Sequence, residues 1–172
     1  MEVVTRLLQS DEPVTFDGQY YQLRGATLLP RPQRQGGPCI LVGGNGGKRT
    51  LANVVRYADE WNCVMLLPRD FSQMNKRLTE LLNSTGRKPE SVRRSMMTGC
   101  IFGRDEIALK VKLAVRKQTV NELHGRGAIA GSKGQVQEQL RELEEAGLQR
   151  IMLQWLDLDD LNGLEALARA IL

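Results

Sequence analysis

The fold is decided by residues 38–64, which read PCILVGGNGGKRTLANVVRYADEWNCV. Residues 39–42 form an apolar run without polar alternation, as expected of a parallel strand that is covered on both faces. After the glycines, apolar side chains recur at helical spacing, at Leu51, Val54, Val55 and Ala58. A second, mostly apolar run begins at Trp61 and continues to Leu67, beyond the end of the quoted stretch. The stretch therefore predicts a strand, a glycine-rich turn, an amphipathic helix and a second strand.

The predicted turn, residues 43–47, is suited to an anionic ligand. Its glycines allow positive φ angles and let the backbone approach a ligand closely. The N–H groups at the start of the following helix lack partners within the helix, and the helix dipole favours negative charge there. Lys48 and Arg49 add two cations at the same place. The turn therefore predicts a phosphate site, with a glycine-rich connection that binds nothing as the alternative.

Two known glycine motifs do not fit this turn. A Walker A loop would need glycine at Val42 and serine or threonine at Arg49. A dinucleotide fingerprint that starts at Gly44 would need a small residue at Arg49, and an acidic residue about 20 positions further on. The turn therefore belongs to neither of these classes.

Composition sets the frame for the rest of the chain. The 172 residues are 41% hydrophobic and 26% charged, which predicts one globular domain over residues 1–172. The 24 basic and 20 acidic residues are scattered, so a nucleic-acid partner is not expected. No apolar run approaches the length of a membrane span, and the N-terminus lacks the core of a signal peptide. We therefore expect a cytoplasmic protein without a membrane partner.

The three cysteines and the one histidine do not suggest a metal site. Cys39, Cys63 and Cys100 each lie in an apolar predicted strand, and no two of them form a CxxC pair. We interpret them as reduced core residues rather than disulfides or metal ligands. His124 lies in a polar segment that we expect to be a loop, without a cysteine or carboxylate partner nearby in the sequence. The sequence therefore predicts no metal.

Strand and helix patterns alternate along the chain. Residues 14–23 predict a hairpin that turns at Asp17-Gly18, and further strands are expected at about residues 95–102 and 150–156. Residues 121–134 hold four glycines and are predicted to be a mobile loop. The inner faces of the later helices are expected at Phe71, Met74, Leu78, Leu81 and Leu82; at Ile107, Val111, Ala114 and Val115; at Val136, Leu140 and Leu143; and at Leu161, Leu164, Ala168 and Ile171.

This alternation predicts an α/β fold. Four strand–helix units indicate a parallel sheet with right-handed crossovers. A complete (β/α)₈ barrel needs eight strands, so the chain has the content of half a barrel. Such a half barrel would leave two unpaired strand edges and an apolar inner face. We therefore expect it to pair with a second copy, as a homodimer, or with a missing N-terminal half.

Three segments together resemble the C-terminal half of the luciferase-like monooxygenases, especially the branch that uses coenzyme F420. They are FDGQYYQLRGATLLPRPQ (16–33), ILVGGNGGKRTLANVVRYADEWN (40–62) and EEAGLQRIMLQWLDLDDLNGLEALARAIL (144–172). The resemblance implies a partial (β/α)₈ TIM barrel with a small hairpin insertion. It also implies an oxidoreductase that handles FMN or coenzyme F420 and a small-molecule substrate.

The resemblance also implies which residues bind the cofactor. In the family, the glycine turn after the fifth strand holds the cofactor phosphate, and the ends of later strands line the flavin pocket. These roles transfer to Gly43, Gly44, Asn45 and Gly46, further to Lys48, Arg49 and Thr50, and by position to Asn62 and to Gln154 or Trp155. For Trp155 the alternative is a packing role.

The resemblance leaves the catalytic residues unknown, because the family places its acid and base side chains in the N-terminal half. Asp157, Asp159 and Asp160 cluster after the last predicted strand, where we interpret them as a solvated loop and a helix cap. The first hypothesis is therefore an oxidoreductase fragment with little turnover of its own. The alternative is a non-catalytic half barrel that binds a phosphorylated ligand or assembles with a partner chain.

Overall fold

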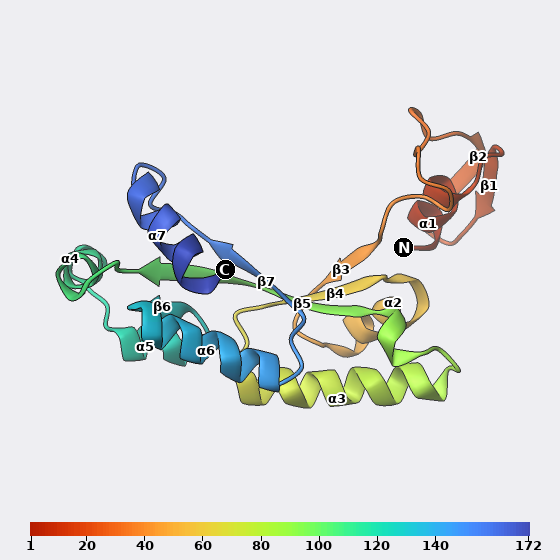
Figure 1. Cartoon of the computed structure of the whole chain (residues 1–172). Helices are drawn as coiled ribbons and strands as arrows, with labels where there is room; N and C mark the ends of the chain where they lie inside the picture. Colours follow the sequence, from red (N-terminus) through yellow and green to blue (C-terminus); the bar gives the residue numbers. More distant parts are fainter.

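The computed structural model describes all residues from 1 to 172 and contains a small N-terminal unit and a parallel α/β unit (Figure 1). The first unit consists of α1 (Glu2–Gln9), β1 (Val14–Asp17) and β2 (Gln22–Ala26). The strands of the second are β3 (Leu41–Gly43), β4 (Glu60–Val64), β5 (Arg93–Phe102), β6 (Ile129–Gly131) and β7 (Arg150–Gln154). Its helices are α2 (Lys48–Tyr57), α3 (Pro68–Ser84), the 3₁₀ turn η1 (Pro89–Ser91), α4 (Glu106–Arg116), α5 (Val120–Gly125), α6 (Lys133–Glu145) and α7 (Leu161–Ile171).

The five parallel strands form an open sheet around the long strand β5. β3 pairs with β4, β4 pairs with residues Arg93–Met97 of β5, and two further strands also pair with β5. Its residues Ser95–Gly99 pair with β7, and Cys100–Phe102 pair with β6. The predicted parallel α/β fold and the hairpin are confirmed. The barrel is not closed, because β3 ends the sheet on one side without a further partner.

The main core lies between one face of the sheet and the helices that cover it. In β4 the side chains of Trp61 and Cys63 point into this core, and the ring of Trp61 stacks on Phe71 of α3 at a centroid distance of 5.6 Å. Leu51 and Val54 of α2 are buried in the same cluster, as their spacing predicts. Burial of these apolar side chains provides the main force that holds α2 and α3 on the sheet.

A buried arginine of β5 ties the sheet to the middle of α3. Arg94 is 6% exposed. Its guanidinium donates to Asn75 Oδ1 (3.0 Å), to Thr79 Oγ1 (3.2 Å) and to two backbone carbonyls near η1. Burial lowers the pKa of this guanidinium, against an opposing effect of Glu90. The side chain therefore satisfies several buried acceptors at once.

We expect Arg94→Ala to lower the free energy of unfolding by about 3 kcal/mol, because the buried acceptors would lose a charged donor. The neighbouring variant Arg93→Ala is the matched control. Arg93 is half exposed and its only ion pair, to Glu60, spans 3.8 Å, so its loss should cost less than about 1 kcal/mol. Urea denaturation of both variants measures the difference, and equal costs would contradict the assigned role of Arg94.

The face of the sheet opposite the helices is more polar than the sequence predicts. Since side chains alternate along a strand, Glu60 and Asn62 lie on the other face of the sheet from Trp61 and Cys63. The carboxylate of Glu60 approaches Arg150 (3.1 Å) and Arg93 (3.8 Å) at the first residues of three adjacent strands. The expectation of an apolar inner face was therefore wrong at this end of the sheet. The pattern was missed because the polar residues are spread over strands that are distant in sequence.

The segment 121–134, predicted to be a mobile loop, instead contains most of α5, all of β6 and the start of α6. Thr119 and Glu122 form a capping box, in which the Glu122 carboxylate accepts the Thr119 N–H at 2.8 Å. This box also lowers the pKa of Glu122. β6 has only three residues and is buried by its pairing with the far half of β5. His124 consequently lies in a helix, not in a loop.

The predicted inner face of α4 was wrong, and that of α7 was wrong in part, since its Ile171 does pack against the core. In α4, Leu109 is buried, whereas Ile107, Val111 and Val115 are 59–77% exposed. In α7 the buried residues are Gly163, Leu167 and Ala170, while Leu161 and Leu164 are exposed. Both helices carry apolar residues on more than one side, so periodicity alone could not identify the face that packs.

Three smaller findings concern cysteines, metal ligands and membrane-spanning helices. Cys39 is exposed and precedes β3, which corrects its prediction as a core residue, whereas Cys63 and Cys100 are buried. Burial raises the pKa of the Cys63 thiol to about 12 and that of Cys100 to about 11. The chain contains no cluster of three or more His, Cys, Asp or Glu side chains placed to hold a metal. None of its helices combines the length and apolarity that a bilayer span requires.

Candidate functional site

The glycine-rich turn joins the carboxyl end of β3 to the start of α2, as predicted (Figure 1). Gly44 and Gly46 have φ angles of 136° and 79°, which side chains disfavour. A Cβ atom on Gly44 would lie 3.0 Å from Thr50 Oγ1, and one on Gly46 would lie 2.7 Å from Met74 Sδ. The turn therefore requires glycine at both positions, for backbone conformation and for space.

Strand β4 fixes the turn in place through four hydrogen bonds. The Asn45 amide donates to the Val64 carbonyl (2.9 Å) and accepts from the Val64 N–H (2.8 Å). Trp61 Nε1 donates to the Gly44 carbonyl (2.8 Å), and the Gly44 N–H donates to the Asn62 carbonyl (2.8 Å). The side chain of Asn45 is thus engaged in holding the turn. The backbone of the turn is held rigidly without using its other N–H groups.

The backbone N–H groups of residues 45–50 donate no hydrogen bond within the chain. Two other helices satisfy part of their first turn with a side chain, since Asp105 caps α4 and Asp160 caps α7, each at 2.8 Å, whereas α1 and α3 also lack a capping side chain. The N-cap of α2 is Gly47, which has no side chain to do this. A row of free donors at a helix start, in the positive end of the helix dipole, is a site for an anion.

The charges beside the turn have the same sign. Lys48 and Arg49 are exposed, and neither forms an ion pair with a carboxylate of the chain. The first turn of α2 contains no acidic residue. Thr50, whose side chain lies beside Gly44, brings a hydroxyl to the same turn. The site therefore offers N–H donors, two cations and a hydroxyl to one ligand.

Asn62 is close to the turn, because it pairs with Gly43 in the register of β3 and β4. It lies on the open face of the sheet, 7% exposed, and its Nδ2 donates to Ser95 Oγ at 2.9 Å. Ser95 was not predicted as a site residue. Nothing in the sequence indicates it, since its contact with Asn62 depends on the register of β4 against β5.

The structure does not bring Trp155 to the turn. Trp155 packs with Ile151 and Leu153 against the helix-covered core, its Nε1 donates to the Asp157 carbonyl (2.9 Å), and Lys112 Nζ lies 4.2 Å from its ring centroid. Gln154 precedes it and lies on the opposite face, which is the open one. Strands β4 and β5 separate both residues from β3.

The aspartates after β7 have defined partners. Lys112 Nζ lies 3.2 Å from Asp157 and 2.7 Å from Asp160, and Arg116 also pairs with Asp157. Partial burial acts against the charged form of Asp157, but the bonds from Arg116 and Lys112 hold its pKa below the ordinary value. Asp160 caps α7 as predicted. Asp157 fixes α4 to this loop rather than lying in solvent.

A parallel α/β sheet with a glycine-rich turn at the carboxyl end of a strand defines the general class. Within it, residues 1–119 match the luciferase-like monooxygenase family, and the chain belongs to that family. The predicted resemblance is therefore confirmed.

Individual relatives agree with this assignment. Over 95 residues the chain is 34% identical to the phthiodiolone/phenolphthiodiolone dimycocerosates ketoreductase of Mycobacterium kansasii. The matched region covers 55% of this chain and 26% of the ketoreductase. The coenzyme F420 dependent tetrahydromethanopterin reductase from Methanopyrus kandleri shares the fold, with a TM-score of 0.75, 18% identity and coverage of 99% of this chain and 60% of the reductase. A riboflavin lyase solved with modified FMN and riboflavin matches with a TM-score of 0.70, 13% identity and coverage of 92% and 47%. The chain thus spans about a quarter of the ketoreductase, 60% of the tetrahydromethanopterin reductase and 47% of the riboflavin lyase.

Proposed function

We propose that this chain is the part of an F420- or FMN-dependent oxidoreductase that anchors the cofactor phosphate. The observation that carries the proposal is the row of free N–H groups at residues 45–50. These groups lie at the carboxyl end of β3, the edge at which parallel α/β proteins and barrels bind ligands. Membership of the luciferase-like family and the F420 or FMN named for the solved relatives support a redox cofactor as the ligand.

The residues of the turn fit a phosphate group. Four of the five turn residues are glycines without a side chain, and no carboxylate of the turn opposes an anion. Lys48 and Arg49 would neutralise its charge, and Thr50 would add one hydrogen bond. Asn62, fixed by Ser95, would present a polar side chain to the rest of the ligand from the open face of the sheet. When bound, the cofactor itself supplies hydride transfer or oxygen activation.

The open face of the sheet needs a second surface to form a complete cofactor pocket. We propose that this surface comes from a second copy of the chain or from the strands that complete the barrel in full-length family members. Either arrangement would exclude water from the cofactor ring and supply acid or base side chains. The chain alone would then bind the cofactor phosphate but turn over substrate slowly.

Fluorescence titration with FMN, coenzyme F420 and riboflavin tests the proposal. Riboflavin lacks the phosphate, so we expect it to bind at least about a hundredfold more weakly than FMN, the loss of two or more charge-assisted contacts. Equal affinity for FMN and riboflavin would exclude the turn as a phosphate anchor. If ribose 5-phosphate bound as tightly as FMN, the chain would instead be a module for phosphorylated ligands in general, without a specific redox cofactor.

Gly47→Asp should separate helix stability from ligand binding. Gly47 has room for a side chain and an N-cap backbone conformation, so the carboxylate would cap α2 and raise the free energy of unfolding by about 0.5–1 kcal/mol. The same carboxylate would occupy the N–H groups and repel phosphate, weakening FMN binding by about tenfold or more. Urea denaturation and FMN titration measure the two effects.

The control for this variant is Gly134→Asp. Gly134 lies in the first turn of α6 and also has open space around its Cα atom. The change adds the same charge at another helix start, so FMN affinity should stay within about twofold of the original, because exposed charges far from a ligand are screened. Unchanged FMN binding in Gly47→Asp would contradict the proposed anchor.

A further inference from the structure

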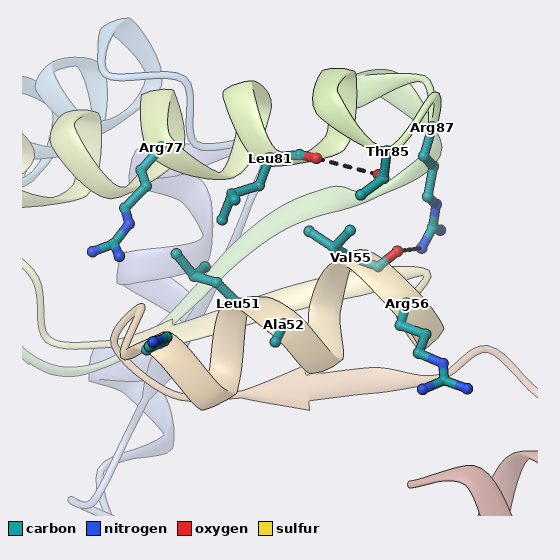
Figure 2. Close-up of a pocket in the computed structure, with 9 residues that line it drawn as sticks. Leu51, Ala52, Val55, Arg56, Arg77, Leu81, Thr85 and Arg87 are labelled. Carbon is teal, nitrogen blue, oxygen red and sulfur yellow. Dashed lines mark hydrogen bonds between the residues drawn. The ribbon is translucent and has the colours of Figure 1, made fainter.

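A groove runs between α2 and α3 on the helical side of the molecule (Figure 2). Its volume is about 660 Å³. Figure 2 shows Leu51 and Val55 of α2 facing Leu81 of α3 along its length. The two helices that bound the groove follow successive strands, β3 and β4. The floor of the groove between them is apolar. The lining residues are Lys48, Leu51, Ala52, Val55, Arg56, Arg77, Leu81, Thr85 and Arg87.

The rim of this groove is positively charged and contains no acidic residue. Arg87 is already engaged, because it donates to the carbonyls of Val55 (3.0 Å) and Ala58 (2.6 Å) at the end of α2. At the same end, Arg56 lies 3.7 Å from Glu2 and over the ring of Tyr57.

The other end of the groove differs, because its two cations have no partner. Arg77 is exposed and forms no ion pair, and neither does Lys48 at the first residue of α2. Figure 2 places Arg77 at the end opposite Arg56 and Arg87. The groove therefore has an apolar floor, one end closed by engaged arginines, and one end with free positive charge.

We propose that this groove binds an amphiphilic carboxylate, a single alkyl chain with an acidic head group. The alkyl chain would lie along Val55 and Leu81, whose side chains are only partly buried, and the carboxylate would accept hydrogen bonds from Arg77 and Lys48. The size favours a small molecule, since ligand pockets commonly measure about 300–1,000 Å³, whereas a stable protein interface covers about 800 Å² on each partner. A groove lined by nine residues offers less surface than a protein partner needs.

This site is separate from the glycine turn. The turn presents backbone N–H groups at the carboxyl edge of the sheet, whereas the groove lies on the outer surface of the helices. Lys48 adjoins both, so Arg77, which has no part in the proposed cofactor site, is the residue that distinguishes them. The inference does not rest on the proposed function.

Calorimetric titration of the chain with dodecanoate, below its micelle concentration, tests the proposal. We expect one saturable site for dodecanoate. Dodecyltrimethylammonium, which has the same chain and the opposite charge, should bind at least about tenfold more weakly, because cations would meet cations. Inorganic phosphate should not compete with dodecanoate at millimolar concentration. Equal binding of the two dodecyl amphiphiles would overturn the proposal, because it would show that the positive rim has no role.

Two variants locate the site. Arg77→Glu should weaken dodecanoate binding by about tenfold or more, while Lys76→Glu, the same charge change on the adjacent exposed residue outside the groove, should leave it within about twofold. Ala52→Glu changes an exposed groove residue on α2 without touching the core, and should also weaken binding. Arg77→Glu and Ala52→Glu should both keep the FMN affinity of the original chain. If Arg77→Glu and Ala52→Glu bound dodecanoate like the original, the ligand would lie elsewhere and the proposal would be wrong.

Discussion

Replacing Gly44 with valine is expected to abolish measurable binding of FMN and coenzyme F420, a loss of about a hundredfold or more. Valine cannot readily adopt a φ of 136°, and its Cβ would meet Thr50 at 3.0 Å. The turn would have to shift, and the free N–H groups of residues 45–50 would no longer converge. Since each charge-assisted hydrogen bond contributes about 1.5–3 kcal/mol, loss of two of them accounts for this magnitude. Fluorescence titration measures the affinity.

The matched control for this variant is Gly86→Val. Gly86 also has a positive φ, 73°, and a Cβ atom there would contact nothing. It follows α3 in the chain, away from the carboxyl edge of the sheet. The strain should lower the stability of both variants by about 1–3 kcal/mol, but only Gly44→Val should lose the ligand. If both variants bound FMN equally well, the geometry of the turn would be irrelevant to the ligand.

The sequence predicted α2 and α3 well because each has one dominant apolar face. Leu51, Val54 and Ala58 share a face at helical spacing, and the sheet accepts only that face. For α4 the pattern contains two apolar stripes, and the one with Leu109 packs because Lys112 and Arg116 hold the helix against the loop after β7. Periodicity is a local property, whereas the choice between two stripes depends on a distant segment.

Strand β6 was missed for a related reason. Its three residues, Ile129–Gly131, carry too little pattern for a strand prediction, and their burial comes from pairing with the end of β5. The candidate site likewise combines a local feature, which the sequence predicts, with contacts between distant segments, which it does not. The glycine turn is local and could be predicted, but the contact between Asn62 and Ser95 depends on strand register. The role of Asn45 in binding Val64 likewise depends on how the turn lies over β4.

The chain is expected to associate with itself at micromolar concentration. β3 is an edge strand, and an exposed edge beside an uncovered sheet face is a surface to which another chain can bind. Leu41, at the start of β3, is 46% exposed on this side. The ion pairs of Glu60 make one end of the face polar, so we expect the contact to centre on β3 and on the apolar residues beyond that end, such as Met97.

Leu41→Glu should therefore convert the dimer to a monomer, since it places a charge on the edge strand where a partner would have to desolvate it. Val111→Glu is the matched control, because Val111 is also an exposed apolar residue, 59% accessible, but lies on α4 away from β3. Sedimentation velocity measures both variants. A dimer that persists in Leu41→Glu but dissociates in Val111→Glu would assign the contact to the exposed stripe of α4. If the original chain were itself a monomer, the sheet would stay open to solvent and the prediction would be wrong. Only dissociation confined to Leu41→Glu is consistent with a contact at the β3 edge, the position at which a closed barrel would add its next strand.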